Sequence, residues 1–227
     1  MPTKKKLTII EKNALAYARL SLYVVRGALT FNIKKEPHIK EFVHLIGEPV
    51  ICVAECRLNT QEHFPIQLKK DGTPKKNQRE YCDLEDESYE GKKIDYIELD
   101  PAWKDNNFEW LYCLTYDGRI VKIGMTIKSL FERFVSSYSC GTARAMRLNT
   151  CSSTNFILSE CNFVAKKNDI KVEIYGIRCD PIKKKITRFG ITKECRFSGV
   201  RDQETMLTQR FKDEYNHIPI LCVQEGK

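Results

Sequence analysis

The sequence lacks the features that would assign it to a membrane, secreted or zinc-binding class. No apolar run approaches the length of a membrane span, and the basic residues 1–6 are not followed by the apolar stretch and cleavage site of a secretion signal. No Cys-x-x-Cys occurs, and no Cys or His pair at zinc spacing follows Cys52 and Cys56. We therefore expect a cytoplasmic protein without a membrane segment.

Acidic residues are outnumbered by basic ones. The 227 residues include 38 Lys and Arg against 30 Asp and Glu, a formal net charge of +8. This balance favours a polyanionic partner, although many basic proteins bind no nucleic acid. Ten cysteines are many for the length, but Cys52, Cys113 and Cys222 lie in apolar runs, where a thiol behaves as a small hydrophobe. Their placement predicts reduced cysteines.

The N-terminal part combines helical and strand patterns. Residues 8–30 carry apolar side chains at three- and four-residue intervals, as in one long helix that packs on a core or forms a dimer interface. Residues 41–45 favour a short helix, and the β-branched run at 49–54 favours a strand. We place a boundary near residue 105, before the segment that carries the strongest pattern.

The most polar basic stretch, residues 69–79, surrounds a turn. Asp71-Gly72-Thr73-Pro74 has the composition of a turn. One interpretation is a solvated loop, since most charge runs are solvated. The other is an arm along a nucleic-acid backbone, where basic side chains displace counterions. The residues concerned are Lys69, Lys70, Lys75, Lys76 and Arg79.

Residues 110–141 predict a strand, a tight turn, a second strand and a helix. An apolar run precedes Asp117-Gly118, which is a strong hairpin signal, and residues 119–123 alternate like a half-buried strand. Gly124 closes the second strand at a place where a side chain would be in the way. Ser129-x-x-Glu132 has the form of a capping box that opens the helix.

The C-terminal third continues the alternation of helices and strands. Residues 154–168 favour a helix, 171–177 a third strand, and 181–195 a basic excursion in the form of a hairpin. Residues 202–215 favour a last helix with Leu207, Phe211 and Tyr215 on one stripe. The pattern as a whole predicts an α+β fold.

The segment from residue 110 onward resembles the core of the GIY-YIG nuclease superfamily. Trp110-Leu111-Tyr112 stands where the family has Gly-Ile-Tyr, and Lys122-Ile123-Gly124 where it has Tyr-Ile-Gly. Arg133 matches the arginine of the following helix, and Ser-Tyr-Ser-Cys-Gly at 137–141 is similar to a subgroup of type II restriction endonucleases. The resemblance covers roughly the C-terminal half. It implies a small mixed or antiparallel three-stranded sheet flanked by helices, here with a helical and β extension at the N-terminus.

The resemblance also implies catalytic roles. Tyr112 would be the general base or orient the attacking water, and Arg133 would clamp the scissile phosphate. Lys122, in place of the second tyrosine, would favour ionised Tyr112 or bind water or phosphate. Tyr138 would contact phosphate or join a proton network, yet it lies one residue out of α-helical register with Arg133. Each residue also has a purely structural alternative. Tyr112 would be a core tyrosine and Lys122 an outward-facing strand lysine. Arg133 would be a surface arginine that pairs with Glu132 or solvent, and Tyr138 a packing tyrosine.

The family holds its metal ion with one glutamate on a later helix, and Glu204 matches that position in order and helical context. The plain alternative is a glutamate in the first helical turn that the helix dipole favours. Glu160 and Glu194 are rivals. Glu160 precedes the third predicted strand, and Glu194 lies in the basic excursion without an apolar helical stripe.

We therefore predict a sequence-specific, double-stranded DNA endonuclease of the type II restriction kind with one divalent ion per active site. The ion would be Mg²⁺, for which Mn²⁺ would substitute, with Glu204 as its ligand. A palindromic target needs two active sites, which predicts a homodimer. Residues 1–105 would serve DNA recognition and dimerisation, and residues 106–227 would form the nuclease core with DNA-contacting insertions that include Arg144 and Arg147.

The alternative to a nuclease is a noncatalytic DNA-binding module that keeps the same fold. Two other nuclease folds rank lower on sequence. One needs a Glu/Asp-x-Lys triplet on an apolar strand, and no convincing triplet occurs. The other needs histidines at motif spacing from Asn or Cys. No such spacing is found at the four histidines His38, His44, His63 and His217.

Overall fold

The computed structural model describes residues 33–58, 70–72, 94–138 and 152–222. The helix predicted at 8–30 lies outside these residues. So do Arg144, Arg147 and all of the predicted basic arm except residues 70–72, where Lys70 is exposed at a turn.

The described residues alternate between helices and strands, which confirms the α+β class. The helices are α3 (Ile39–Ile46), α5 (Ser153–Lys167) and α6 (Val200–Tyr215), with a 3₁₀ turn η1 (Pro101–Lys104) and a π-helix η2 (Glu132–Tyr138). The strands are β1 (Val50–Leu58), β2 (Ile94–Glu98), β3 (Glu109–Tyr116), β4 (Arg119–Thr126), β5 (Val172–Cys179), β6 (Ile182–Arg188) and β7 (Ile191–Phe197). Apart from the helix predicted after Ser129, where the structure has the π-helix η2, the helices and strands predicted from residue 41 onward are confirmed within the described residues. The basic excursion is the β6–β7 hairpin.

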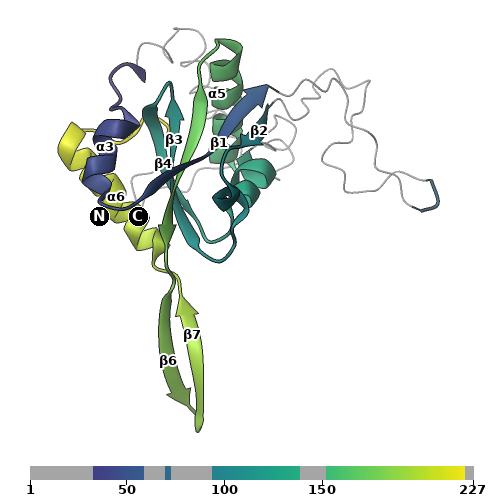
Figure 1. Ribbon diagram of the computed structural model, residues 1–227, viewed down its shortest axis with the longest axis vertical. Coiled ribbons are helices and arrows are strands. Elements are labelled where there is room, and N and C mark those ends of the chain that lie inside the picture. Colours follow the sequence, from purple (N-terminus) through teal and green to yellow (C-terminus); the bar gives the residue numbers. More distant parts are fainter. Residues whose placement is uncertain (1–32, 59–69, 73–93, 139–151, 223–227) are drawn as a thin grey trace, which may run out of the picture. The chain divides into compact units, whose positions relative to one another are not determined.

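Five strands form the main sheet, in the order β2-β1-β5-β3-β4 (Figure 1). The pairs β1–β5, β5–β3 and β3–β4 are antiparallel. The prediction of a three-stranded sheet is therefore wrong in size: β3, β4 and β5 are present as expected, but β1 and β2 continue the sheet beyond β5. An edge strand exposes a row of unpaired N–H and C=O groups. On β5 these backbone groups form hydrogen bonds with β1. The periodicity of the sequence does not show which strand pairs with β5.

The chain forms two compact units. Within the described residues, unit 1 comprises 56–58, 70–72, 94–96, 134–138 and 152–169, and unit 2 comprises 33–55, 97–133 and 170–222. Strands β1 and β2 contribute residues to both units. The functional division predicted at residue 105, between a recognition extension and a nuclease core, stays a prediction.

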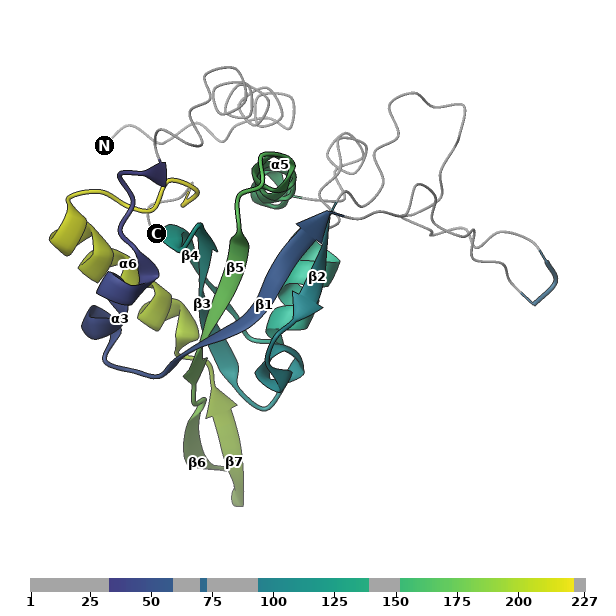
Figure 2. The ribbon, with the colours of Figure 1, turned by 45° about the horizontal axis from the view of Figure 1, so that its top comes forward.

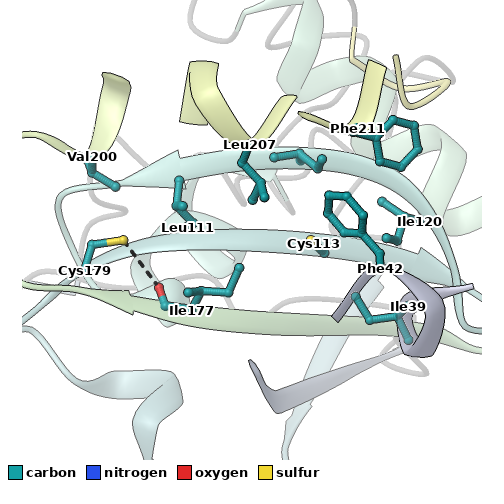
Figure 3. Packing of buried hydrophobic residues seen from close by; sticks show 11 residues of the cluster. Ile39, Phe42, Leu111, Cys113, Ile120, Ile177, Cys179, Val200, Leu207 and Phe211 are labelled. Atoms are coloured by element: carbon teal, nitrogen blue, oxygen red, sulfur yellow. Dashed lines mark hydrogen bonds between the residues drawn. The ribbon is translucent and has the colours of Figure 1, made fainter. Parts of the chain in front are cut away.

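The core of unit 2 lies between the sheet and the helices α3 and α6 (Figures 2 and 3). Leu111 and Cys113 point from β3 into this layer. Phe42 of α3 meets Phe211 of α6 edge to face, with ring centroids 5.2 Å apart. Leu207 and Phe211 are buried and Tyr215 packs on Phe211, which confirms the predicted stripe. This packing holds α6 against β3 and β4.

The turn between β3 and β4 follows the local sequence signal. Asp117 (φ 47°) and Gly118 (φ 75°) both have positive φ, as a two-residue type I′ hairpin requires. The Asp117 carboxylate also accepts a hydrogen bond of 2.8 Å from the Lys171 backbone N–H. The turn is therefore joined to the residue just before β5.

The cysteines whose side chains the structure describes are free thiols: Cys52, Cys56, Cys113, Cys161, Cys179 and Cys222. Burial raises the pKa of Cys113 to about 12, so this thiol stays protonated at neutral pH. No helix in the described part of the chain is long and apolar enough to cross a membrane.

Glu36 is a buried carboxyl group in unit 2. Burial raises its pKa from 4.5 to about 7, against the lowering effects of His217 and the Ile220 backbone N–H. Because the folded state binds this proton more tightly than the unfolded chain, the stability that the proton contributes is complete below pH 4.5 and is lost as the pH rises through about 7.

We expect Glu36→Gln to flatten this part of the stability profile. As the pH rises from 4.5 to 7, the free energy of unfolding of the variant should increase relative to that of the wild type. Above pH 7 the variant should be more stable by roughly 1–3 kcal/mol. Urea unfolding across pH 4–9 measures the difference, with the exposed Glu48→Gln as the control. A wild-type and Glu36→Gln difference that does not change with pH would contradict the assignment.

Candidate active site

Tyr112 lies at the centre of β3 between two glycines. Its register partners are Gly124 on β4 and Gly176 on β5. A Cβ atom on Gly124 would lie 2.3 Å from the Tyr112 hydroxyl oxygen and 2.4 Å from Cζ. The phenol ring therefore extends across Gly124, and this glycine is required because the ring occupies the space of a side chain. Tyr112 is fully buried.

Lys122 lies on the edge strand β4, two residues before Gly124. In an antiparallel pair, residues displaced by two from the direct partner are diagonal neighbours on the same face, which places Lys122 diagonally opposite Tyr112. Lys122 is only 8% exposed. The outward-facing lysine considered as the plain alternative is therefore wrong, because an outward-facing strand lysine would keep its side chain in water.

The segment that carries Arg133 begins with a partial capping box. The Glu132 N–H donates to Ser129 Oγ over 3.2 Å, as predicted. The reciprocal bond is replaced: the Ser129 N–H donates to Asn106 Oδ1 over 2.8 Å, and the Glu132 carboxylate pairs with Lys128. Glu132 therefore has a cationic partner other than Arg133.

Residues 132–138 form a π-helix, where an α-helix was expected. In a π-helix the hydrogen bonds join residues five apart. Arg133 and Tyr138 are five apart, so the α-helical register that separates them does not apply. Tyr138 belongs to unit 1, where it is fully buried and meets Phe134 edge to face at 5.1 Å. This is the environment of a packing tyrosine, and a phosphate contact by Tyr138 stays a prediction.

Glu204 is the fifth residue of α6, which begins at Val200 after Gly199. It therefore lies at the start of the second turn, and the expectation of a first-turn position is wrong because the helix begins two residues earlier than predicted. The favourable effect of the helix dipole on an acidic group fades beyond the first turn, so the dipole does not account for this glutamate. Its side chain is half-buried.

Lys122, Arg133 and Glu204 come together in unit 2. Burial raises the pKa of Glu204, and the positive charges of Lys122, Arg133 and Arg201 lower it in part. Each of these charges must lie near the carboxyl group to act on it, although the three elements that carry Lys122, Arg133 and Glu204 are distant in sequence. The structure thus brings two of the predicted site residues, Lys122 and Arg133, near the half-buried carboxyl group of a third, Glu204.

Two members of this group were missed on sequence. Arg201 precedes Glu204 by three residues, and residues three apart on a helix are neighbours, so this spacing was a usable signal. Cys222 hydrogen bonds with Ile123 through its Sγ atom, and the charges of Lys122 and Glu204 act on its thiol. Burial, the largest effect, raises the pKa of Cys222. No sequence signal links residue 222 to β4.

The two rivals of Glu204 as the metal ligand lie on other elements. Glu160 lies on α5 in unit 1, and Glu194 is exposed on β7. Glu194 is not among the residues whose charges act on Glu204.

The donor set around Glu204 fits Mg²⁺ held by one carboxylate and by substrate oxygens. Proteins bind Mg²⁺ through one or two carboxylates together with water and phosphate groups. Among the described residues, no group of three or more His, Cys, Asp or Glu side chains forms a self-sufficient metal site. The positive charges of Lys122, Arg133 and Arg201 repel a metal ion that binds alone. They favour a metal ion that binds together with a negatively charged phosphate. A site with one carboxylate is therefore chemically consistent with these residues, and Glu204 as the metal ligand stays a prediction.

Comparisons with known proteins give distant structural similarities. No protein-family model matches the chain, and no curated protein sequence matches it. The restriction endonuclease HPY188I in complex with product DNA is similar at 24% identity and a TM-score of 0.47, over 85% of this chain and 90% of that chain. A mutant of bacteriophage T4 EndoII is similar at 17% identity and a TM-score of 0.41, over 82% of this chain and 100% of that chain. Both TM-scores are below 0.5, and the function proposed next therefore rests on the residues of this chain.

Proposed function

We propose that this protein is a sequence-specific, metal-dependent DNA endonuclease of the type II restriction kind. One observation carries the proposal: a buried lysine and a helical arginine act on the same half-buried glutamate, and all three match the positions implied by the GIY-YIG motif. Burying charged groups is costly. Two positive side chains near one carboxylate suit a site that binds a phosphate together with a metal ion.

Each residue has a distinct part in the proposed hydrolysis. Arg133 presents a planar fork of donors to two oxygens of the scissile phosphate. Lys122 adds positive charge where negative charge develops during attack by water. Tyr112 is fully buried, which favours orienting the water over taking its proton directly. Glu204 holds Mg²⁺, which when bound supplies positive charge to the phosphate and assistance to the leaving oxygen.

The cationic environment also supports a polyanionic substrate. The chain has a net charge of +8, and neutralising phosphates releases counterions and strengthens binding. We propose that Lys69, Lys70, Lys75, Lys76, Arg79, Arg144 and Arg147 contribute to this binding. We also propose that the protein acts as a homodimer on a palindromic site. Light scattering of the protein–DNA complex should then give two chains per duplex.

The direct test is digestion of plasmid DNA. Purified protein with Mg²⁺ or Mn²⁺ should produce discrete fragments, and EDTA should stop the reaction because the metal carries part of the transition-state charge. Sequencing the fragment ends would then define the target and the stagger. Tight DNA binding without cleavage under any divalent metal would contradict the proposal and favour the noncatalytic DNA-binding module.

A further inference from the structure

The β6–β7 hairpin has exposed surface that the proposed active site does not use. It joins β5 to α6 and extends away from the main sheet (Figure 1). Seven residue pairs hold it together, and the hydroxyl groups of Thr187 and Thr192 lie 2.9 Å apart across the strands. Residues 184–194 are all exposed, so this part of the hairpin projects into solvent.

The tip of the hairpin presents an aromatic side chain where the turn does not favour one. Phe189 (φ 55°) and Gly190 (φ 75°) form a two-residue turn with positive φ at both positions. Such turns prefer Asn-Gly or Asp-Gly, and the β3–β4 turn uses Asp117-Gly118. A bulky residue with positive φ is strained, and such strain is concentrated at functional positions. Phe189 is also 97% exposed, so packing does not explain its presence.

The charge of the hairpin identifies the kind of partner. Residues 182–197 include six basic residues and one acidic residue. The pairing register puts Lys184, Arg188 and Lys193 on one face with Ile186 and Ile191, and Lys185 on the other face with the two threonines and Glu194. Positive side chains on both faces fit a polyanion that surrounds the hairpin. They oppose self-association, because a second copy would bring the same charges together.

The dimensions agree with a groove of duplex DNA. A strand of seven residues is about 23 Å long, and a DNA groove admits a two-stranded β-ribbon. Apolar side chains carried into DNA by such elements separate neighbouring base pairs and kink the duplex. A membrane surface would instead require one continuous apolar face, and on this hairpin lysine and arginine interrupt the apolar side chains.

We propose that the β6–β7 hairpin enters a groove of duplex DNA and that Phe189 inserts as a wedge between adjacent base pairs. Lys184, Lys185, Arg188 and Lys193 contact the flanking phosphates. This inference takes its DNA partner from the proposed function, but it needs no cleavage. Local unstacking by Phe189 would make binding depend on how easily the contacted base step deforms.

Phe189→Asn provides a sharp test because asparagine suits the turn better than phenylalanine does. Binding is measured without divalent metal on short duplexes that carry 2-aminopurine at successive positions. The wild type should raise the fluorescence at one or a few positions. Phe189→Asn should bind roughly 10-fold more weakly and lose that increase, while its thermal midpoint stays equal or rises. Phe189→Trp should keep the fluorescence increase.

Lys185→Gln is the matched control on the same hairpin. It should weaken binding and reduce the salt dependence by about one counterion, yet give the full fluorescence increase at saturation. Equal affinity and equal fluorescence for wild type and Phe189→Asn would overturn the wedge. Binding to phosphatidylglycerol vesicles without binding to duplexes would overturn the choice of DNA.

The same assays separate this inference from the proposed function. A wild type that shows the Phe189-dependent fluorescence increase but does not cut DNA with any divalent metal would leave the wedge standing and remove the nuclease. A wild type that cuts plasmid DNA while Phe189→Asn binds and cuts equally well would retain the nuclease and remove the wedge.

Discussion

Glu204→Gln is expected to reduce metal-dependent DNA cleavage by at least about 100-fold without lowering stability. Glutamine keeps the size of the side chain but removes the negative charge that the metal ion requires. Because burial raises the pKa of Glu204, the ionised carboxylate opposes folding. The wild type therefore loses stability as the pH rises through that raised pKa, whereas the glutamine variant does not.

Initial cleavage rates and thermal midpoints, measured on the same preparations, check both parts of this prediction. Glu214→Gln is the control, since Glu214 lies exposed on the same helix. The acid limb of the wild-type cleavage profile should lie above the ordinary carboxyl value of 4.5. Cleavage by Glu204→Gln at the wild-type rate would remove Glu204 as the metal ligand.

Gly124→Ala is expected to reduce both activity and stability, because the added methyl group would collide with Tyr112. The new Cβ atom would lie 2.3 Å from the hydroxyl oxygen and 2.4 Å from Cζ of a ring that is fully buried. Overpacking of this kind costs about 1–3 kcal/mol. A displaced Tyr112 should lower cleavage by about 100-fold, since small misplacements of catalytic groups are costly.

Gly176→Ala is the matched control, because Gly176 is the other register partner of Tyr112. Its added Cβ would lie 2.8 Å from Leu130 Cδ1 and 3.1 Å from Trp110, not against Tyr112. Gly176→Ala should destabilise the fold, but it should lower the cleavage rate less than Gly124→Ala does. In a background with Tyr112→Val, Gly124→Ala should lose most of its cost, which urea unfolding in a double-mutant cycle would measure. Equal losses of cleavage in the two alanine variants would show that stability alone is responsible.

Local signals in the sequence were sufficient wherever neighbouring residues decide the structure. Asp117-Gly118 predicted the β3–β4 turn because few residue pairs tolerate positive φ at both positions. The apolar stripe of α6 predicted which face is buried, since its period matches the helix. The role of Gly124 was also anticipated, although the identity of the obstructing group, the Tyr112 ring, required the pairing of β3 with β4.

Other features depend on partners that are distant in the chain. The position of β1 beside β5 widened the sheet to five strands. The π-helical form of residues 132–138 changed the relation between Arg133 and Tyr138, and helical periodicity in a short segment does not distinguish the two helix types. Likewise, the sequence left open whether Lys122 is a site residue or an outward-facing strand lysine, and its burial rules out the second.

The sequence by itself determined most of the helices and strands, the tight turn at Asp117-Gly118 and the residue types available for phosphate chemistry. The tertiary structure decided that the charges of Lys122, Arg133 and Arg201 act on Glu204, and that Phe189 is exposed at the tip of a basic hairpin. The physical reason is one of range. Backbone preferences and side-chain periodicity act over a few residues, whereas burial and electrostatic interaction depend on which distant segments pack together.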